Sequence, residues 1–192
     1  MSRTRVHGVL TQFLLAAVLF ACPFPAQASE VSLKLEPGLA LPLPGASRSQ
    51  GFNVGSAASV KALLGLARYV DLETGVGFIG LPMSSVQLSS LSGMASTYGA
   101  GLRLKRPHDQ RSFRGASPWI EAEALYVHAG RLEGMGFAMG AGLAFPVGVT
   151  RQFWLGPFVR YLDILQPNRT DVENRASPTL FAGLTFEIVV NR

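Results

Sequence analysis

The feature that most constrains the fold of this chain is an alternation, with a period of two, of mostly large apolar residues with glycine and alanine at positions 134–146. A repeat of two is that of a β-strand, whose side chains point alternately to its two faces. In a soluble sheet the second face would be polar, but here it offers only glycine and alanine. The pattern favours a narrow barrel whose large apolar residues face lipid, while the small ones leave room inside for longer side chains of neighbouring strands. The outward set is Met135, Phe137, Met139, Ala141, Leu143 and Phe145, and the inward set is Gly136, Ala138, Gly140, Gly142 and Ala144.

The same repeat recurs along the chain. It is found at residues 31–41, 58–66, 71–78, 97–105, 119–126, 153–161 and 179–190, although the alanine and leucine content of 58–66 alone would also allow a helix. About eight strands result, which is an even number and the smallest size of bacterial transmembrane barrel. We therefore predict an all-β fold, a closed antiparallel up-and-down transmembrane β-barrel.

Loop lengths give this barrel an orientation. Outward loops are predicted at residues 42–53, 81–95, 129–134 and 166–178, and periplasmic turns at 68–71, 106–118 and 146–152. Long outward loops and short periplasmic turns are typical of such barrels. Only 106–118 and 129–134 depart from that rule.

Residues 1–28 have the pattern of a cleaved secretory signal peptide. Arg3 and Arg5 precede an apolar block, residues 9–20, which is too short to span a bilayer as a helix, and Ala26-Gln-Ala28 forms a small-x-small cleavage site. Residues 29–192 are then predicted to be one outer-membrane β-barrel domain. Cys22, the single cysteine, would be removed; the alternative is that residues 19–22 form a lipobox and that Cys22 is lipidated.

Composition excludes several other classes. Removing Arg3 and Arg5 lowers the formal net charge from +5 to about +3, an excess too small to suggest a nucleic-acid-binding protein. No later segment has ~18 consecutive apolar residues, so a helical membrane protein is not predicted.

Charged residues within the strands fall on the face opposite the large apolar residues. A charge facing lipid at mid-bilayer costs about 2–4 kcal/mol, so these groups are expected inside, where cations and anions can pair across a narrow lumen. The predicted lumen charge network comprises Lys34, Glu36, Lys61, Glu73, Arg103, Lys105, Glu121, Glu123, Arg160 and Glu187. We expect these pairs to close the lumen; the alternative is a narrow porin-like channel lined by the same charges.

Aromatic residues near the strand ends are expected to form girdles at the two membrane interfaces. The periplasmic set is Tyr69, Trp119, Phe145 and Phe153, and the outer set is Phe78, Tyr98, Tyr126 and Tyr161.

No catalytic, cofactor-binding or metal-binding residues are predicted. His128 lies at the outer end of its strand and Ser84, Ser85 and Ser96 occur elsewhere, but its own strand offers no serine on the same face and no spacing fixes an acid partner. Residues 75–80 match the glycine-rich dinucleotide fingerprint by letter, yet a proline and a serine-rich loop follow in place of a helix.

Three segments resemble the small OmpA-like outer-membrane β-barrel family. They are residues 98–107 (YGAGLRLKRP), 117–123 (SPWIEAE) and 156–167 (GPFVRYLDILQP), and the resemblance covers essentially all of residues 29–192. It implies the barrel domain without the peptidoglycan-binding domain that often follows in related chains. It also implies recognition by the barrel-assembly machinery through a terminal aromatic residue, whereas the last aromatic residue here is Phe186.

We thus expect a monomeric integral outer-membrane protein of a Gram-negative bacterium, not an enzyme, with a role in envelope integrity, adhesion or lipopolysaccharide contact. The arginines of the outward loops could bind lipopolysaccharide phosphates: Arg48, Arg131, Arg169 and Arg175. The alternatives are the narrow channel, a lipid A-modifying enzyme, and a soluble lipocalin-like barrel, which would need its bulky faces turned inward.

Overall fold

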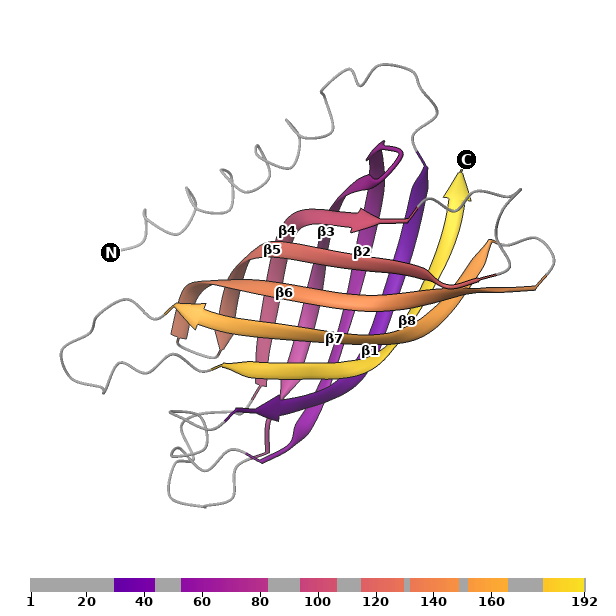
Figure 1. Cartoon of the computed structure of the whole chain (residues 1–192). Helices are drawn as coiled ribbons and strands as arrows, with labels where there is room; N and C mark the ends of the chain where they lie inside the picture. Colours follow the sequence, from indigo (N-terminus) through magenta and orange to yellow (C-terminus); the bar gives the residue numbers. More distant parts are fainter. Residues whose placement is uncertain are drawn as a thin grey trace.

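The chain forms eight antiparallel strands that close into a barrel (Figure 1). The computed structural model describes residues 30–43, 53–82, 94–106, 115–129, 132–148, 152–165 and 178–191. Each strand pairs with its neighbours in sequence, and β8 pairs with β1, which leaves no free edge. The strands are β1 (Val31–Pro42), β2 (Gly55–Ala67), β3 (Val70–Gly80), β4 (Met94–Lys105), β5 (Ser117–Ala129), β6 (Leu132–Val147), β7 (Phe153–Leu165) and β8 (Thr179–Asn191).

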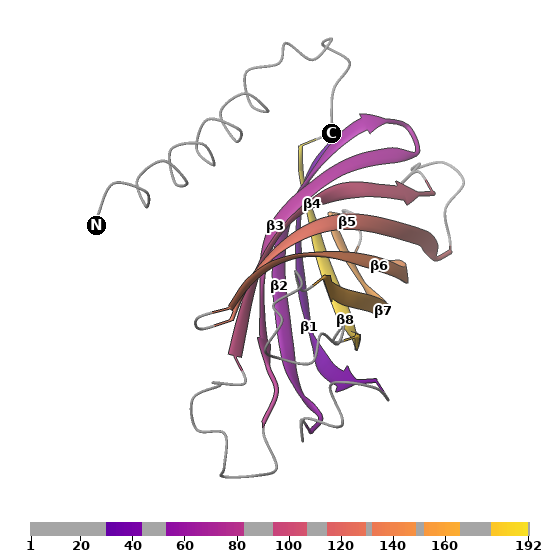
Figure 2. The same cartoon turned by 90° about the vertical axis from the view of Figure 1, so that its left-hand side faces the viewer.

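The two ends of the barrel are distinct. At one end, called the turn end below, β1 begins, β8 ends and the tight turn at Arg68 and Tyr69 joins β2 to β3 (Figures 1 and 2). The opposite end is called the loop end. If the turn end faces the periplasm, the predicted outward connections all leave from the loop end.

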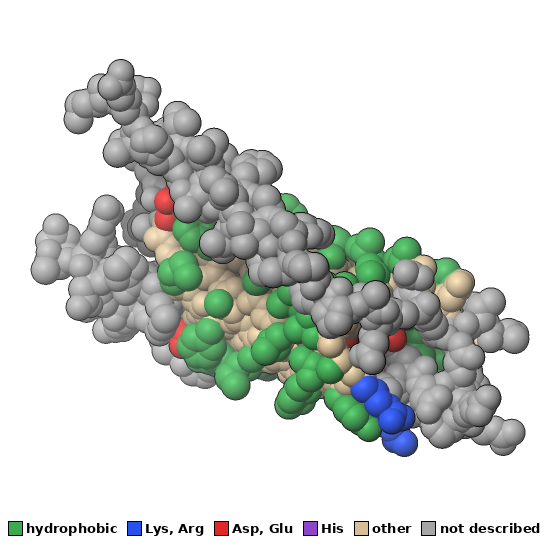
Figure 3. Space-filling view, turned by 90° about the horizontal axis from the view of Figure 1, so that it is seen from above, with side chains coloured by type: hydrophobic (Ala, Val, Ile, Leu, Met, Phe, Trp, Pro, Cys, Tyr) green, Lys and Arg blue, Asp and Glu red, His purple; other side chains and the backbone are tan. Residues whose placement is uncertain are grey.

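The predicted orientation of the side chains is the one observed. Large apolar side chains cover the outer wall (Figure 3), and Phe137, Leu143 and Leu184 are 37%, 40% and 47% exposed. Lys61, Arg103 and Glu121 are buried, with exposures of 4%, 0% and 5%. No helix in the described residues is long and apolar enough to cross a membrane. The prediction of a closed antiparallel barrel is therefore confirmed.

Small residues of β6 make room in the lumen for the side chains of β5. A Cβ atom added to Gly140 would lie 2.7 Å from Oε1 of Glu121, and one added to Gly142 would press against the ring of Trp119. The space over the small inward residues of β6 is thus filled by side chains of β5.

Several strands are longer than predicted. β2 begins at Gly55, β5 runs from Ser117 to Ala129, and β7 continues to Leu165. Backbone pairing continues beyond the apolar belt, where the side chains no longer alternate in polarity and the sequence signal ends. The predicted outer connection at 129–134 shortens accordingly to the two residues between Ala129 and Leu132.

The girdle prediction is wrong for Trp119. Its side chain is 3% exposed and lies inside the barrel, because residue 119 shares the face of Glu121 and Glu123 on β5. Five other predicted girdle residues are exposed: Phe145, Phe153, Phe78 and Tyr98 on the outer wall, and Tyr69 in the turn between β2 and β3. Tyr126 and Tyr161 are half-buried.

Some predictions fall outside the described residues. These are the signal peptide at 1–28, the fate of Cys22, and the loop arginines Arg48, Arg131, Arg169 and Arg175.

Candidate functional site: a charge network in the lumen

The structure places all ten residues of the predicted network inside the barrel, together with one more acid. The period of two on each strand turns them inward, and every one of them is buried. The additional residue is Asp71, 1% exposed, which belongs both to the predicted turn 68–71 and to the predicted repeat 71–78 and was left out of the predicted network. Its position two residues before Glu73 on the same face was the signal that could have identified it.

A cluster in the middle of the lumen joins residues from five strands. We call this set the central cluster: Lys34, Glu36, Lys61, Glu73, Glu121, Glu123 and Arg160. Lys34 is at its centre, with Nζ 2.7 Å from Glu121, 3.1 Å from Glu73 and 3.3 Å from Glu36. A fully buried ammonium group is thereby surrounded by three carboxylates.

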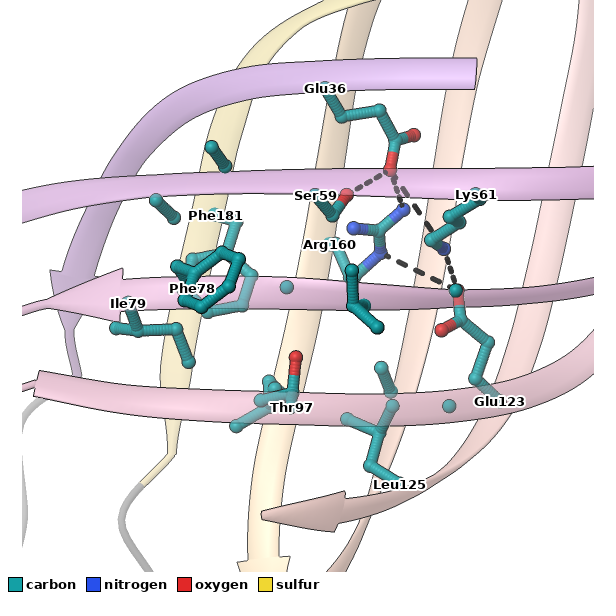
Figure 4. Close-up of a pocket in the computed structure, with 18 of the residues that line it drawn as sticks. Glu36, Ser59, Lys61, Phe78, Ile79, Thr97, Glu123, Leu125, Arg160 and Phe181 are labelled. Carbon is teal, nitrogen blue, oxygen red and sulfur yellow. Dashed lines mark hydrogen bonds and ion pairs between the residues drawn. The ribbon is translucent and has the colours of Figure 1, made fainter. Parts of the chain in front are cut away.

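The other two cations of the central cluster also contact several acids each. Nζ of Lys61 lies 3.3 Å from Glu73 and 3.2 Å from Glu121, and it also contacts Glu123. Arg160 donates through Nη2 to Glu36 at 2.6 Å and through Nε to Glu121 at 2.6 Å. Figure 4 shows Arg160 and Lys61 converging on Glu36 and Glu123.

A second cluster lies nearer the turn end. Arg103 makes a bidentate contact with Glu187, at 2.9 and 3.2 Å, and its Nε is 3.4 Å from Asp71. Lys105 lies 3.1 Å from Asp71 and donates to Glu30 at 3.0 Å. Bidentate pairing fixes the planar guanidinium group in one orientation.

Trp119 lies between the two clusters, and its ring is near one cation of each. Nζ of Lys34 lies 4.6 Å from the centre of its ring, and the guanidinium carbon of Arg103 lies 5.7 Å from it. Both distances are within the range of cation–π attraction. The misassigned girdle residue is therefore part of the lumen packing.

The described lumen charges are not balanced. Five cations face six acids, because Asp71 joins the five acids predicted from the sequence. A buried charge is costly unless it is paired, and each cation here has at least two acidic partners, although the second partner of Lys105 is Glu30, which is not one of the six. The shared pairing explains how an excess of one acid is held without an isolated carboxylate.

Between the central cluster and the loop end, the lumen contains a small cavity. Its walls are mainly apolar, with Ile79, Leu125 and Phe181 among them, and Thr97 adds a hydroxyl group (Figure 4). Glu36, Lys61, Glu123 and Arg160 also line it. The cavity therefore reaches the charges of the central cluster.

The three carboxylates of Glu73, Glu121 and Glu123 lie close enough to hold a metal ion, with ligand atoms within 4.8 Å of one another. Lys61 contacts all three carboxylates. Its ammonium group takes the position in which a cation would be bound, so these residues form ion pairs within the protein.

The register across strands gives His128 the neighbours that its own strand lacks. Ser96 of β4 is its cross-strand partner on one side and Glu133 of β6 on the other. Nδ1 of His128 lies 3.4 Å from Oε1 of Glu133. Ser84 and Ser85 lie outside the described residues.

No protein-family model matches the chain, and no curated protein matches it by sequence. Among solved structures it is similar to the Neisserial surface protein A, with a TM-score of 0.50, 16% identity, and coverage of 82% of this chain and 95% of that one. It is also similar to the N-terminal β-barrel domain of Pseudomonas aeruginosa OprF, with a TM-score of 0.48 and 11% identity over 84% of this chain and all of that domain. The outer-membrane protein AlkL matches with a TM-score of 0.43 and 14% identity over 88% of this chain and 94% of that one. With its eight strands closed into a barrel and its match to the Neisserial surface protein A, the chain has the fold of the small eight-stranded outer-membrane barrels, as the OmpA-like resemblance implied.

Proposed function

We propose that this chain is a monomeric integral protein of the bacterial outer membrane, with a lumen closed by ion pairs and a structural or interactive role. That role would be envelope integrity, adhesion or contact with lipopolysaccharide. The barrel-assembly machinery would insert it after the signal peptide is removed.

The observation that carries the proposal is the central cluster. Its seven side chains come from β1, β2, β3, β5 and β7 and meet at ion-pair distance across the lumen. Side chains can fill the interior of an eight-stranded barrel, and here the filling groups are also held by ion pairs with one another. A filled lumen favours a structural or interactive role, in which the outer surface and the loops make the contacts, over the transport of solutes through the barrel.

Conductance across a planar lipid bilayer tests this closure. The refolded protein should give no steady current, whereas the double variant Lys61→Ala/Glu123→Ala should conduct, because it removes two of the side chains that fill the lumen. The double variant loses one cation and one acid, so the net charge of the lumen is unchanged. Met139→Ala, on the outer wall of β6, is the matched control and should behave as the wild type. A steady wild-type current would contradict the proposal.

A narrow channel is the second candidate, and the cavity towards the loop end favours it. If the central cluster is only a gate, the wild type should conduct in brief openings, and the double variant should lengthen them. Ion selectivity in those openings would then report the excess of acid in the lumen.

The outer-membrane location is tested by extraction. An integral barrel should stay with the outer-membrane fraction until detergent is added. A soluble lipocalin-like barrel would be released without detergent. Such a barrel would also need its bulky side chains turned inward, whereas the described strands turn them outward.

A further inference from the structure

Three polar side chains form a row on the outer wall near the loop end. Ser96 of β4 pairs in register with His128 of β5, which pairs in register with Glu133 of β6. Directly opposed residues of an antiparallel pair lie on the same face, with Cβ atoms about 4.5–5.5 Å apart. The row therefore brings together a serine, a histidine and an acid that lie within a segment of 38 residues, 96–133.

The contact between His128 and Glu133 uses the same ring nitrogen as the histidine–acid contact of a catalytic triad. Oε1 of Glu133 lies 3.4 Å from Nδ1, so Nε2 is the ring nitrogen that this contact does not use. In a Ser–His–acid triad the acid holds the imidazole at Nδ1, so that Nε2 can take the proton of the serine. Ser96 lies on the side of His128 opposite Glu133, as that role requires.

The surroundings of the row fit an acyl chain. Phe78 of β3 is the register partner of Ser96, and one step towards the turn end lies the next outward row, which contains Tyr98 and Tyr126. The two tyrosine rings are 6.5 Å apart, and the Tyr126 hydroxyl group interacts with Glu133. Tyrosines on the wall of a barrel mark the boundary between headgroups and acyl chains, which is where the ester bonds of a lipid lie.

We propose that Ser96, His128 and Glu133 form an esterase site that hydrolyses acyl esters of lipids in the adjoining leaflet. The site goes beyond the proposed function, since it lies on the outer wall and uses no residue of the lumen. Its substrate would reach it by lateral diffusion in the membrane.

The reaction balances without a cofactor. Oγ of Ser96 attacks the ester carbonyl carbon and gives its proton to Nε2 of His128. The bond between the acyl carbon and the alcohol oxygen breaks, and the alcohol leaves with that proton. Water then attacks the acyl-Ser96 ester, passing a proton through His128 to Oγ, and releases the fatty acid.

The full chain refolded into lipid vesicles provides the test. One arm uses phosphatidylethanolamine and phosphatidylglycerol alone, and a second arm adds lipopolysaccharide, so that the two sources of acyl ester are distinguished by the fatty acids released. Release in either arm should fall at least about 100-fold in Ser96→Ala and in His128→Ala. Ser56→Ala, an exposed outward serine of β2, is the matched control and should keep full activity.

Glu133 acts through His128 and is a positioning residue. Glu133→Gln should lower kcat with KM little changed and should shift the pH profile of hydrolysis, while Glu133→Asp should recover part of the rate. A fluorophosphonate probe should label the wild type at Ser96 and label His128→Ala weakly.

Equal heat-modifiable migration of all variants shows that each is folded. Absence of both fatty-acid release and probe labelling in the folded wild type would overturn the esterase site, as would activity that survives Ser96→Ala. Neither result bears on the closed lumen, which is tested by conductance.

Discussion

At the scale of single residues, Arg160 shows how the lumen uses charge. Its guanidinium group bridges Glu36 and Glu121, which belong to different strands. A planar group with several donors can serve two carboxylates at once, whereas an ammonium group is a point charge. The identity of the cation is therefore specific to its position.

Replacing Arg160 with Met should destabilise the barrel by about 3–5 kcal/mol, because it leaves two buried carboxylates short of a cation. Arg160→Lys should cost less, since a charge remains. Urea unfolding in lipid vesicles, followed by tryptophan fluorescence, measures both. The control is Arg106→Met at the exposed rim, where about 0–1 kcal/mol is expected; an equal loss at both sites would contradict the pairing.

Gly142 is a second test at this scale. A side chain there would collide with the ring of Trp119, so Gly142→Val should destabilise the barrel by about 1–3 kcal/mol through overpacking. Ala141→Val, its neighbour on the outward face of β6, should be close to neutral. The same unfolding measurement applies, and a neutral Gly142→Val would show that the lumen is loosely filled.

At the scale of the strand, the period of two accounts for what the sequence could predict. Once the apolar face of each strand is assigned to lipid, every charge on the other face is placed inside, and the ten predicted residues are found there. Asp71 was left out of the predicted network, and Trp119 was assigned to a girdle, because both residues lie near strand ends. Their parity with Glu73 and Glu121 was the more reliable signal.

The depth of a lipid-facing residue along β6 should set the cost of a charge. Met139, in the middle of the strand, faces outward, and so does Val147 at its end. Met139→Arg should cost about 2–4 kcal/mol and Val147→Arg about 0–1 kcal/mol. Unfolding in vesicles measures both, and similar costs would mean that β6 does not cross the bilayer as described.

At the scale of the whole molecule, the partners in the lumen are set by closure of the barrel. Arg160 and Glu36 are 124 residues apart in sequence, and Lys34 and Glu121 are 87 apart. These pairs depend on the stagger of all the strands, which no single strand encodes. The sequence could thus predict which residues face the lumen, but not which of them pair, nor that Ser96, His128 and Glu133 form one row.

The enclosed lumen can be tested directly with the two tryptophans of the chain, Trp119 and Trp154, which are 3% and 2% exposed inside the barrel. In vesicles of lipids brominated along the acyl chains, their fluorescence should be quenched only weakly. A reporter variant with both replaced by Phe and with Phe137→Trp on the outer wall should be quenched strongly. Strong quenching of the native tryptophans, equal to that of the reporter, would contradict a barrel that turns its apolar side chains to lipid and encloses its charges.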